Sequence, residues 1–146
     1  MTIAAILAQK GTDVVSIPSD HPLSQAIAML ARHRIGAVPV VGNDDAVRGI
    51  FSERDMIRLL AEAEGDAAAL LATPVGSVMT TEPLTAARDD SILAALSLMT
   101  HRRIRHLPVV EHGRLIGIVS IGDLVKHRID RIEADAAAMR DYIQQA

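Results

Sequence analysis

The stretch GIFSERD, residues 49–55, returns later in the chain as GIVSIGD, residues 117–123. In both copies a short apolar run leads to a serine, and an aspartate follows three positions later: Ser52 with Asp55, and Ser120 with Asp123. This spacing is typical of a helix capping box. In such a box the serine side chain accepts from the third backbone N–H, and the acidic side chain accepts from the serine N–H. Each copy therefore predicts a strand that runs directly into the start of a helix.

The same two stretches also fit a binding interpretation. The N-terminus of a helix attracts anions because its first backbone N–H groups lack partners within the helix. A serine hydroxyl at that place can donate to a phosphate, and an aspartate can accept from two ribose hydroxyls. A cap that faces a cleft serves both purposes, so the pattern leaves both interpretations open.

The similarity extends far beyond these two stretches. Residues 15–41 align without a gap with residues 84–110, which places Pro-Val-Val on Pro-Val-Val. Deleting one residue in the turn that follows brings residues 49–55 onto residues 117–123. A shared order of motifs of this kind indicates a tandem duplication.

Each repeat is predicted to run strand, helix, strand, strand, helix. Ser19 or Asp20 is expected to cap the first helix, with Pro22 in its first turn. The apolar residues of that helix recur at helical spacing: Leu23, Ala26, Ile27, Leu30 and Ala31. In the first repeat the first strand, second strand, turn, third strand and second helix are expected at residues 13–17, 37–41, 42–45, 47–51 and 52–64.

The second repeat copies this order, and a further helix is expected after it. Its first helix has an apolar face made of Ile92, Ala95, Leu96 and Met99. Its turn, third strand and second helix are expected at residues 111–114, at residues 115–119 and from Ser120. Residues 61–73 are expected to extend the second helix of the first repeat into a linker that ends at Pro74. Residues 128–146 are expected to form one more helix, with apolar residues on one side: Ile129, Ile132, Ala136, Met139 and Ile143.

These elements predict an α+β fold. A half of this kind would carry a three-stranded sheet with one face poorly covered. Domains of about 60 residues are only marginally stable when they fold alone. We therefore expect two β-α-β-β-α repeats packed sheet to sheet about a pseudo-twofold axis. The expected division is residues 1–73 for the first repeat with its helical linker, 74–128 for the second repeat and 129–146 for an amphipathic C-terminal helix. The apolar side of that helix needs cover, so we also expect a homodimer.

The composition excludes several classes of protein. The 146 residues include no Cys, no Trp, one Phe and one Tyr, so the 49% of apolar residues is almost wholly aliphatic. Without cysteine there is no disulfide or thiolate chemistry, and two aromatic side chains give no stacking platform for bases. A net charge of −3 and a pI near 6.0 oppose binding to duplex nucleic acid. No apolar run is long enough to cross a bilayer, and the first residues lack the basic region of a signal peptide. We therefore expect a cytoplasmic protein that does not contact membranes.

The chain also lacks the spacings that metal sites and catalytic motifs require. No pair among the six His residues has the helical spacing beside an acid that zinc sites have. The glycines near Ser120 do not form a nucleophile elbow, and no Gly-rich phosphate-binding loop motif occurs. We expect no metal site, no catalytic cofactor and no enzymatic activity.

HRRIRH, residues 101–106, is the densest basic cluster in this chain of negative net charge. It fits a solvated helix end followed by an edge strand protected by charge. It also fits a phosphate site made by Arg105 and His106, and nucleic-acid binding is a third alternative. The first repeat has Gly36 and Ala37 at these positions, so two clefts built by the duplication would differ.

A duplicated β-α-β-β-α unit with a Pro-Val-Val strand, followed by Gly-Ile-x-Ser-x-x-Asp at a helix start, resembles the CBS domain, named for cystathionine β-synthase. The tandem arrangement resembles a stand-alone bacterial CBS-domain pair over about residues 6–128, and Val-Met-Thr at residues 78–80 adds to the similarity. The resemblance implies an adenine nucleotide in the clefts between the repeats: AMP, ADP or ATP, or in some members NAD(H) or S-adenosylmethionine. It also implies regulation of an attached or separate partner protein.

The resemblance also assigns site residues. Asp55 and Asp123 would hold ribose hydroxyls, and Ser52 and Ser120 would lie by the phosphates. In this family the second strand of the opposite repeat often meets the phosphates. The residues at these positions are Arg105 and His106 for the Asp55 cleft, with Arg54 as a further cation, and Ala37 and Val38 for the Asp123 cleft. First-strand positions whose backbone would read the adenine edge are Ser16, Ile17, Thr85 and Ala86.

We therefore expect the Asp55 cleft to take the more anionic ligand. In the second repeat Gly122 stands where the first has Arg54, which implies a weaker Asp123 cleft. The leading interpretation is an adenine-nucleotide-sensing regulatory module. The alternative is a ligand-free module for protein interaction or dimerisation, in which the capping boxes are purely structural.

Overall fold

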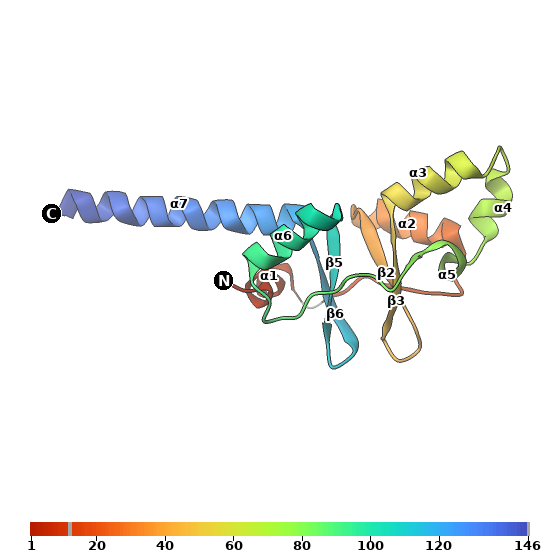
Figure 1. Ribbon diagram of the computed structural model, residues 1–146, viewed down its shortest axis with the longest axis horizontal. Coiled ribbons are helices and arrows are strands. Elements are labelled where there is room, and N and C mark those ends of the chain that lie inside the picture. The colour runs from red at the N-terminus through yellow and green to blue at the C-terminus, as the bar shows by residue number, and fades with distance from the viewer. Residues whose placement is uncertain (12, 146) are drawn as a thin grey trace.

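The computed structural model describes residues 1–11 and 13–145, and it is built around two β-hairpins (Figure 1). The first hairpin pairs β2, Ala37–Val41, with β3, Val47–Ser52, and the second pairs β5, His106–Glu111, with β6, Arg114–Ser120. The hairpins lie side by side at the centre of the molecule, and helices cover their outer sides. This arrangement confirms the α+β fold of two similar halves.

The strand registers match between the halves. Ala37 pairs with Ser52 in the first hairpin, and His106 pairs with Ser120 at the equivalent place in the second. Both hairpins also have a register shift between the two valines of their Pro-Val-Val strand. Equivalent pairing and equivalent irregularities are the structural counterpart of the sequence repeat.

The helix that precedes each hairpin also ends in the same way. These helices are α2, Leu23–His33, and α6, Ile92–Arg102. Each ends at an arginine in the left-handed conformation, Arg34 or Arg103, both with φ of 54°. The left-handed residue ends the helix and turns the chain into the second strand.

The start of α2 differs from the prediction. The N-cap is Pro22 without a side-chain cap hydrogen bond, so neither Ser19 nor Asp20 caps this helix. The first amide, that of Leu23, instead donates to the backbone oxygen of Thr73 at 2.8 Å. A carbonyl from a distant segment thus accepts the hydrogen bond of the first helical N–H. Sequence spacing does not reveal such a contact.

The two sheets are unequal, which corrects the expected three strands in each half. The first sheet has the order β1-β2-β3-β4, and the second holds β5 and β6. The first strand is shorter than predicted: β1 is Ile17–Pro18 rather than residues 13–17. The added edge strand β4, Thr80–Thr81, comes from the segment before α6 and pairs antiparallel with β3. In the second half, the equivalent of β1 is a single bridge between Ala86 and Val109.

The N-terminal helix packs against the second half rather than the first. This helix, α1, is Ile3–Lys10, and it lies beside β6 and the last helix. Ile3 and Ile6 belong to the core of the second half together with Ala86, Ile92, Ala95, Met99, Leu107, Val109, Val119 and Leu124. The other core holds Phe51 with Ile17, Leu23, Ala26, Leu30, Val38, Val40 and Val75. Because α1 crosses over, Lys10 lies in the second half.

The glycines that begin the two repeated stretches are explained by close packing. A Cβ on Gly49 would lie 2.4 Å from the Met79 sulfur and 2.5 Å from the Thr80 oxygen. A Cβ on Gly117 would lie 2.6 Å from Leu7. In each half, therefore, the segment that precedes the other repeat crosses directly over the third strand, and only glycine leaves room for it.

The predicted extension of the second helix through residues 61–73 is wrong. Helix α3 is Glu53–Glu62. The helical conformation does not continue, because Glu64 and Gly65 are left-handed, with φ of 48° and 94°. A separate helix α4, Ala67–Ala72, follows, and the Asp66 side chain caps it by accepting from the Ala69 N–H at 3.2 Å. Short α5, Val75–Val78, then leads into β4.

The last helix is longer than predicted. The structure joins the helix expected from Ser120 and the one expected at residues 128–146 into α7, Ile121–Gln145; Ala146 lies outside the described residues. No Pro or Gly after Gly122 interrupts the helix. Its C-terminal part extends well beyond the rest of the molecule (Figure 1).

Candidate functional site

Both predicted capping boxes are present. The Ser52 Oγ accepts from the Asp55 N–H at 3.3 Å, and the Asp55 carboxylate accepts from the Ser52 N–H at 3.0 Å. In the second copy the Asp123 N–H donates to the Ser120 Oγ at 3.0 Å, and the Asp123 carboxylate accepts from the Ser120 N–H at 2.9 Å. The structural interpretation of the repeated stretches is therefore confirmed, and the binding interpretation depends on what faces them.

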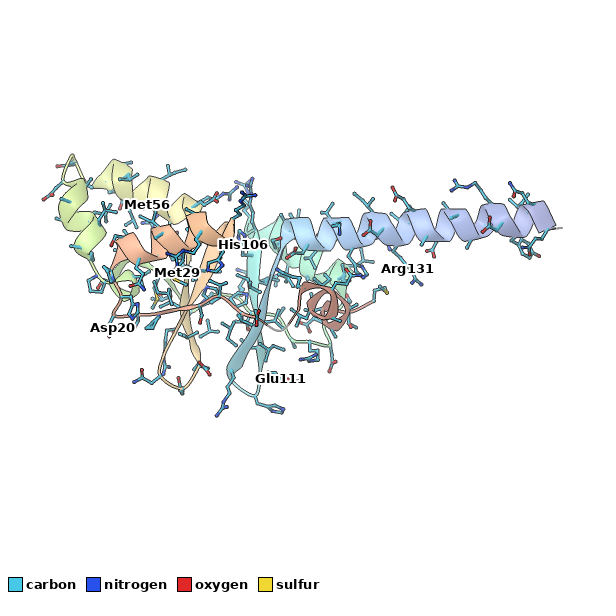
Figure 2. The ribbon with its side chains drawn as sticks, turned by 180° about the vertical axis from the view of Figure 1, so that it is seen from behind. Asp20, Met29, Met56, His106, Glu111 and Arg131 are labelled. Atoms are coloured by element: carbon cyan, nitrogen blue, oxygen red, sulfur yellow. The ribbon has the colours of Figure 1, made fainter. Side chains whose placement is uncertain are left out.

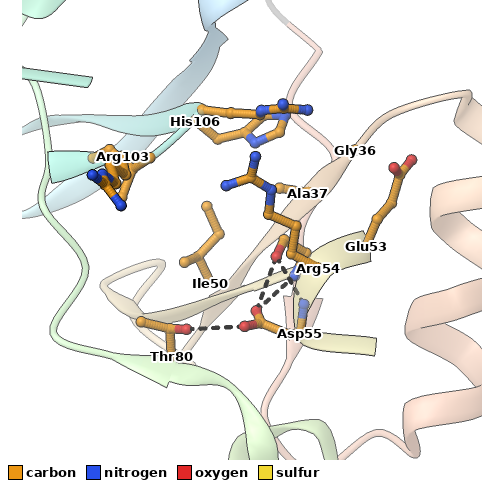
Figure 3. Close-up of a pocket in the computed structure, with 12 residues that line it drawn as sticks. Gly36, Ala37, Ile50, Glu53, Arg54, Asp55, Thr80, Arg103 and His106 are labelled. Carbon is orange, nitrogen blue, oxygen red and sulfur yellow. Dashed lines mark hydrogen bonds between the residues drawn. The ribbon is translucent and has the colours of Figure 1, made fainter. Parts of the chain in front are cut away.

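The first box faces a cavity of about 250 Å³ between the two halves, which we call the Asp55 cleft (Figure 3). The start of α3 forms one wall, and the residues that lead into β5 of the opposite half form the other. Its lining residues are Gly36, Ala37, Ile50, Ser52, Glu53, Arg54, Asp55, Thr80, Arg103, Ile104, Arg105 and His106. The structure thus brings together Ser52, Arg54, Asp55, Arg105 and His106, as the sequence predicts.

The two oxygens of the Asp55 carboxylate differ in how strongly they are hydrogen-bonded within the protein. One oxygen accepts from the Ser52 N–H and hydroxyl, at 3.0 and 3.1 Å. The other accepts from the Thr80 hydroxyl at 3.4 Å and lies 3.6 Å from an exposed Arg58 guanidinium. These long contacts leave the second oxygen able to accept hydrogen bonds from a ligand.

Cations from both halves line the same cleft. Arg54 begins α3 and extends toward His106, while Arg103 and Arg105 come from the opposite half (Figure 3). Among the described residues, none of these three guanidiniums forms an ion pair with a carboxylate. Guanidinium groups bind phosphate through two parallel hydrogen bonds, so this wall suits an anionic group.

The second box faces a related cavity, also of about 250 Å³, which we call the Asp123 cleft. Its lining residues are Lys10, Arg34, Ile35, Gly36, Ala37, His106, Ile118, Ser120 and Asp123. The two clefts therefore use equivalent elements, and Arg34 takes the place that Arg103 has in the first.

Lys10 makes the Asp123 cleft different. Its ammonium group donates to the Asp123 carboxylate at 2.8 Å and to the Ile118 backbone oxygen at 2.9 Å. In the Asp55 cleft, the segment equivalent to the end of α1 supplies the neutral Thr80 hydroxyl instead. Asp123 thus has a close ion pair within the protein, whereas the ion pair of Asp55 with the exposed Arg58 is longer, at 3.6 Å.

These contacts shift the pKa of Asp123. Burial raises the pKa of the carboxyl, but the Lys10 hydrogen bond, the Ser120 N–H and the Lys10 charge together lower it below its ordinary value. The ionised form of Asp123 is therefore favoured in the folded protein.

His106 lines both clefts, and it lies where the two halves of the molecule meet (Figure 2). Burial lowers the pKa of its imidazole below 6.5, with smaller opposing effects from the charges of Asp123 and Glu53. Its ring packs closely on Gly36, where a Cβ would lie 3.1 Å from two ring atoms. Burial therefore favours the neutral imidazole at a place where a bound anion would favour its protonation.

The strand positions expected to read adenine do not line either cavity. Ile17 and Ala86 are buried, while Ser16 is partly exposed and Thr85 is exposed. Val38, expected by the phosphates of the Asp123 cleft, is also buried and lines neither cavity, whereas Ala37 lines both. The Ala86 N–H already donates to the Pro108 oxygen at 2.9 Å, and its oxygen accepts from the Val110 N–H at 2.9 Å. The adenine-reading role of these positions stays a prediction.

Sequence reasoning missed several lining residues. Lys10 and Thr80 reach the clefts from segments outside the repeated pattern. Thr80 belongs to the Val-Met-Thr stretch noted in the sequence, but neither residue was assigned to a site. Arg34 and Arg103 are identical residues at equivalent positions, and this identity was a signal that could have identified them.

Two further findings concern the described residues as a whole. They hold no group of three or more His, Asp or Glu residues placed to bind a metal ion, and no helix long and apolar enough to cross a membrane.

Comparisons with known proteins agree with the fold. A family model for the CBS domain matches residues 10–62 and again residues 75–130. The CBS domain-containing protein YhcV of Bacillus subtilis is 32% identical over 126 residues, which cover 86% of each chain.

Solved structures have the same fold. A CBS-domain-containing protein of Agrobacterium tumefaciens has a TM-score of 0.79 and 39% identity, over 88% of this chain and 99% of that chain. A CBS domain protein of Pyrobaculum aerophilum, solved in complex with AMP, has a TM-score of 0.73 and 27% identity, over 84% of this chain and 89% of that chain. The tandem repeat predicted from sequence is therefore one known in solved structures.

Proposed function

Because the chain belongs to the CBS-domain family, we propose that it is a regulatory module that senses adenine nucleotides, and not an enzyme. One observation carries the proposal: the Asp55 cleft combines a carboxylate from one half with two guanidiniums from the other. A nucleoside phosphate has hydroxyls that need an acceptor and an anionic group that needs cations. The AMP complex of the Pyrobaculum relative supports the ligand class.

We assign the roles as follows within this proposal. Asp55 accepts from the ribose hydroxyls, and Ser52 and the start of α3 face the phosphate. Arg54, Arg105 and His106 bind the phosphate, and Arg103 joins them because it lines the same wall. Ser16, Ile17, Thr85 and Ala86 contribute their backbone to the adenine edge. AMP, ADP or ATP is the proposed ligand, with NAD(H) and S-adenosylmethionine as further adenosine-containing candidates.

The two clefts are proposed to be unequal. In the Asp123 cleft a ribose would have to replace Lys10 on the carboxylate or share it, since the ammonium group lies 2.8 Å away. The strand that faces this cleft carries Ala37 and Val38 where the other carries His106 and Leu107. Ser120 and Asp123 therefore form the weaker site, and the Asp55 cleft is the principal one.

Binding would act on a partner through the packing of the two halves. A ligand held by Asp55 and by Arg105 connects α3 of the first half to the residue that directly precedes β5 of the second. It therefore stabilises the arrangement that holds both groups at the ligand, and this changes the population of that arrangement. A partner protein that distinguishes the arrangements would then gain or lose affinity. We further propose that the module works as a homodimer in the cytoplasm.

The alternative is a ligand-free interaction module. It is favoured by the finding that both serine–aspartate pairs form complete capping boxes through hydrogen bonds within the protein. In that case the boxes serve helix stability alone.

Thermal denaturation with each candidate nucleotide tests the proposal. A ligand at about 100 times its Kd adds about 2.7 kcal/mol of stability, which for a chain of this size raises Tm by about 5 to 10 °C. We expect such a rise with at least one of AMP, ATP, NADH and S-adenosylmethionine. No rise with any of them would contradict the sensor and favour the ligand-free module.

A further inference from the structure

The exposed part of α7 carries an apolar stripe that none of the residues described by the structure covers. Ile129, Ile132, Met139 and Ile143 are between 50% and 64% exposed, and Val125 before them is 42% exposed. Beyond the body of the molecule the helix is surrounded by solvent (Figures 1 and 2). Large apolar side chains repeated along one exposed face mark a surface for association.

The spacing of the stripe is that of a coiled coil. The positions 125, 129, 132, 136, 139 and 143 alternate steps of four and three, which is the seven-residue pattern of a helix that packs along another helix. Residues 129, 136 and 143 take the a positions of this heptad, and residues 125, 132 and 139 take the d positions. Ala136 in the middle allows two helices to approach closely.

The flanking charges select the partner and its direction. In a parallel, in-register pair, each g position faces the e position of the next heptad on the other helix. This brings Arg128 opposite the second copy's Glu133, and Asp135 opposite the second copy's Arg140, so both pairs attract. The symmetry repeats each pair on the other side of the seam. Asp135 also lies 3.6 Å from Arg131 in its own helix, at an exposed site where such a pair contributes little.

The antiparallel arrangement that overlaps the whole stripe brings like charges together. It places Glu133 opposite Glu133 and Asp135 opposite Asp135, and it brings Lys126 near Arg140. Like charges at these positions destabilise a coiled coil and so oppose this arrangement. The charge pattern therefore fits a second copy of the same chain in parallel orientation.

We propose that α7 forms a parallel, in-register, two-stranded coiled coil with α7 of a second copy through the stripe of residues 125–143. This inference rests on the homodimer part of the proposed function and specifies its interface. It leaves both clefts outside the contact, because the stripe lies on a different part of α7 from Asp123.

Cysteine cross-linking tests the orientation, since the chain has no cysteine of its own. Ala136→Cys places two thiols opposite each other in a parallel, in-register pair, and mild oxidation should join the chains covalently. Ala134→Cys is the matched control: it is the same substitution on the opposite face of the helix and should remain mostly uncross-linked. Equal cross-linking of the two variants would overturn the proposal.

Sedimentation equilibrium of the full chain tests the interface. Wild type should have the mass of two chains, and Ile132→Glu should raise the dissociation constant at least about tenfold because it buries charge in the seam. Ala138→Glu, which adds the same charge outside the seam, should change it little. Arg140→Glu alone and Asp135→Arg alone should each weaken association, and the double variant should recover it.

The possible results distinguish failure of the α7 interface from failure of the homodimer and from failure of nucleotide binding. A dimeric wild type whose association survives Ile132→Glu would overturn the α7 interface and leave the homodimer standing. A monomeric wild type, or a larger assembly such as a trimer, would overturn the two-stranded coiled coil itself. Nucleotide binding is measured separately by the thermal shift, which Ile132→Glu should leave unchanged.

Discussion

Replacing Asp55 with asparagine separates helix capping from ligand binding. The amide oxygen of asparagine can still accept from the Ser52 N–H, which lies 3.0 Å from the carboxylate in wild type. The variant loses the negative charge in the first turn of α3, which costs about 0.3 to 1 kcal/mol of stability. Without ligand, therefore, Tm should fall by only a few degrees.

The loss of ligand binding should be larger. Hydrogen bonds to a charged group contribute about 1.5 to 3 kcal/mol each, so weakening the ribose contacts at Asp55 should cost up to about 3 kcal/mol. This is about a hundredfold in Kd. At an AMP concentration of about 100 times the wild-type Kd, the stabilisation should fall from about 2.7 to about 0.4 kcal/mol. The rise in Tm should then shrink from about 5 to 10 °C to about 1 °C.

Asp123→Asn is the matched control in the same thermal-shift assay. It removes the equivalent acid and also the partner of Lys10, which lies 2.8 Å away, so it should destabilise the unliganded protein at least as much as Asp55→Asn. The rise in Tm with AMP should nevertheless stay close to that of wild type. If Asp55→Asn keeps the full rise and Asp123→Asn loses it, the assignment of the principal cleft is refuted.

Four further outcomes follow from the packing and the charges. Lys10→Met should cost about 0.5 to 1 kcal/mol near pH 6, because the pair is partly exposed. The lowered pKa of Asp123 gives stability above its unfolded value of 3.8 that is lost as pH falls through the folded pKa, so urea unfolding should show this difference vanishing in acid. The lowered pKa of His106 means that the unfolded chain takes up the proton first. Stability should therefore fall as pH drops below 6.5, and His106→Gln should lack this fall. Phe51→Ala should cost about 3 to 5 kcal/mol in urea unfolding, because the ring is fully buried. Gly36→Ala should weaken AMP binding in calorimetry, because its Cβ would lie 3.1 Å from the His106 ring; unchanged affinity would place the ligand away from His106.

The sequence predicted the parts of the fold that depend on local pattern. The two hairpins and both capping boxes follow from the periodicity of apolar residues and from the serine–aspartate spacing. The resemblance to the CBS domain, rather than the local pattern, implied that Arg105 and His106 serve the cleft of Ser52, Arg54 and Asp55, and these five residues line one cavity in the structure.

The parts that were missed depend on contacts between distant segments. The N-terminal helix crosses to the second half, and for this reason Lys10 meets Asp123, which is far away in the chain. Strand β4 pairs with β3 only because the chain passes over Gly49 on its way to the second half. The helix expected through residues 61–73 is interrupted at Gly65 by a left-handed backbone conformation. The Ala-rich sequence on both sides favours a helix, so the sequence pattern did not predict this interruption.

The unequal clefts follow from the same cause. From the two repeats alone, the clefts differ because the second repeat has Arg105 and His106 where the first has Gly36 and Ala37. The larger difference is the charge placed on Asp123 by Lys10, and only the tertiary structure brings that residue to the site.

We propose that a nucleoside phosphate binds in the Asp55 cleft with its phosphate at the guanidiniums of the opposite half. Calorimetric titration with AMP and with adenosine, on wild type and on Arg105→Ala, tests it most directly because the difference between the two ligands isolates the phosphate. We predict that wild type binds AMP at least about tenfold more tightly than adenosine, and that Arg105→Ala loses most of this difference while still binding adenosine. Equal affinity of wild type and Arg105→Ala for AMP would contradict the account.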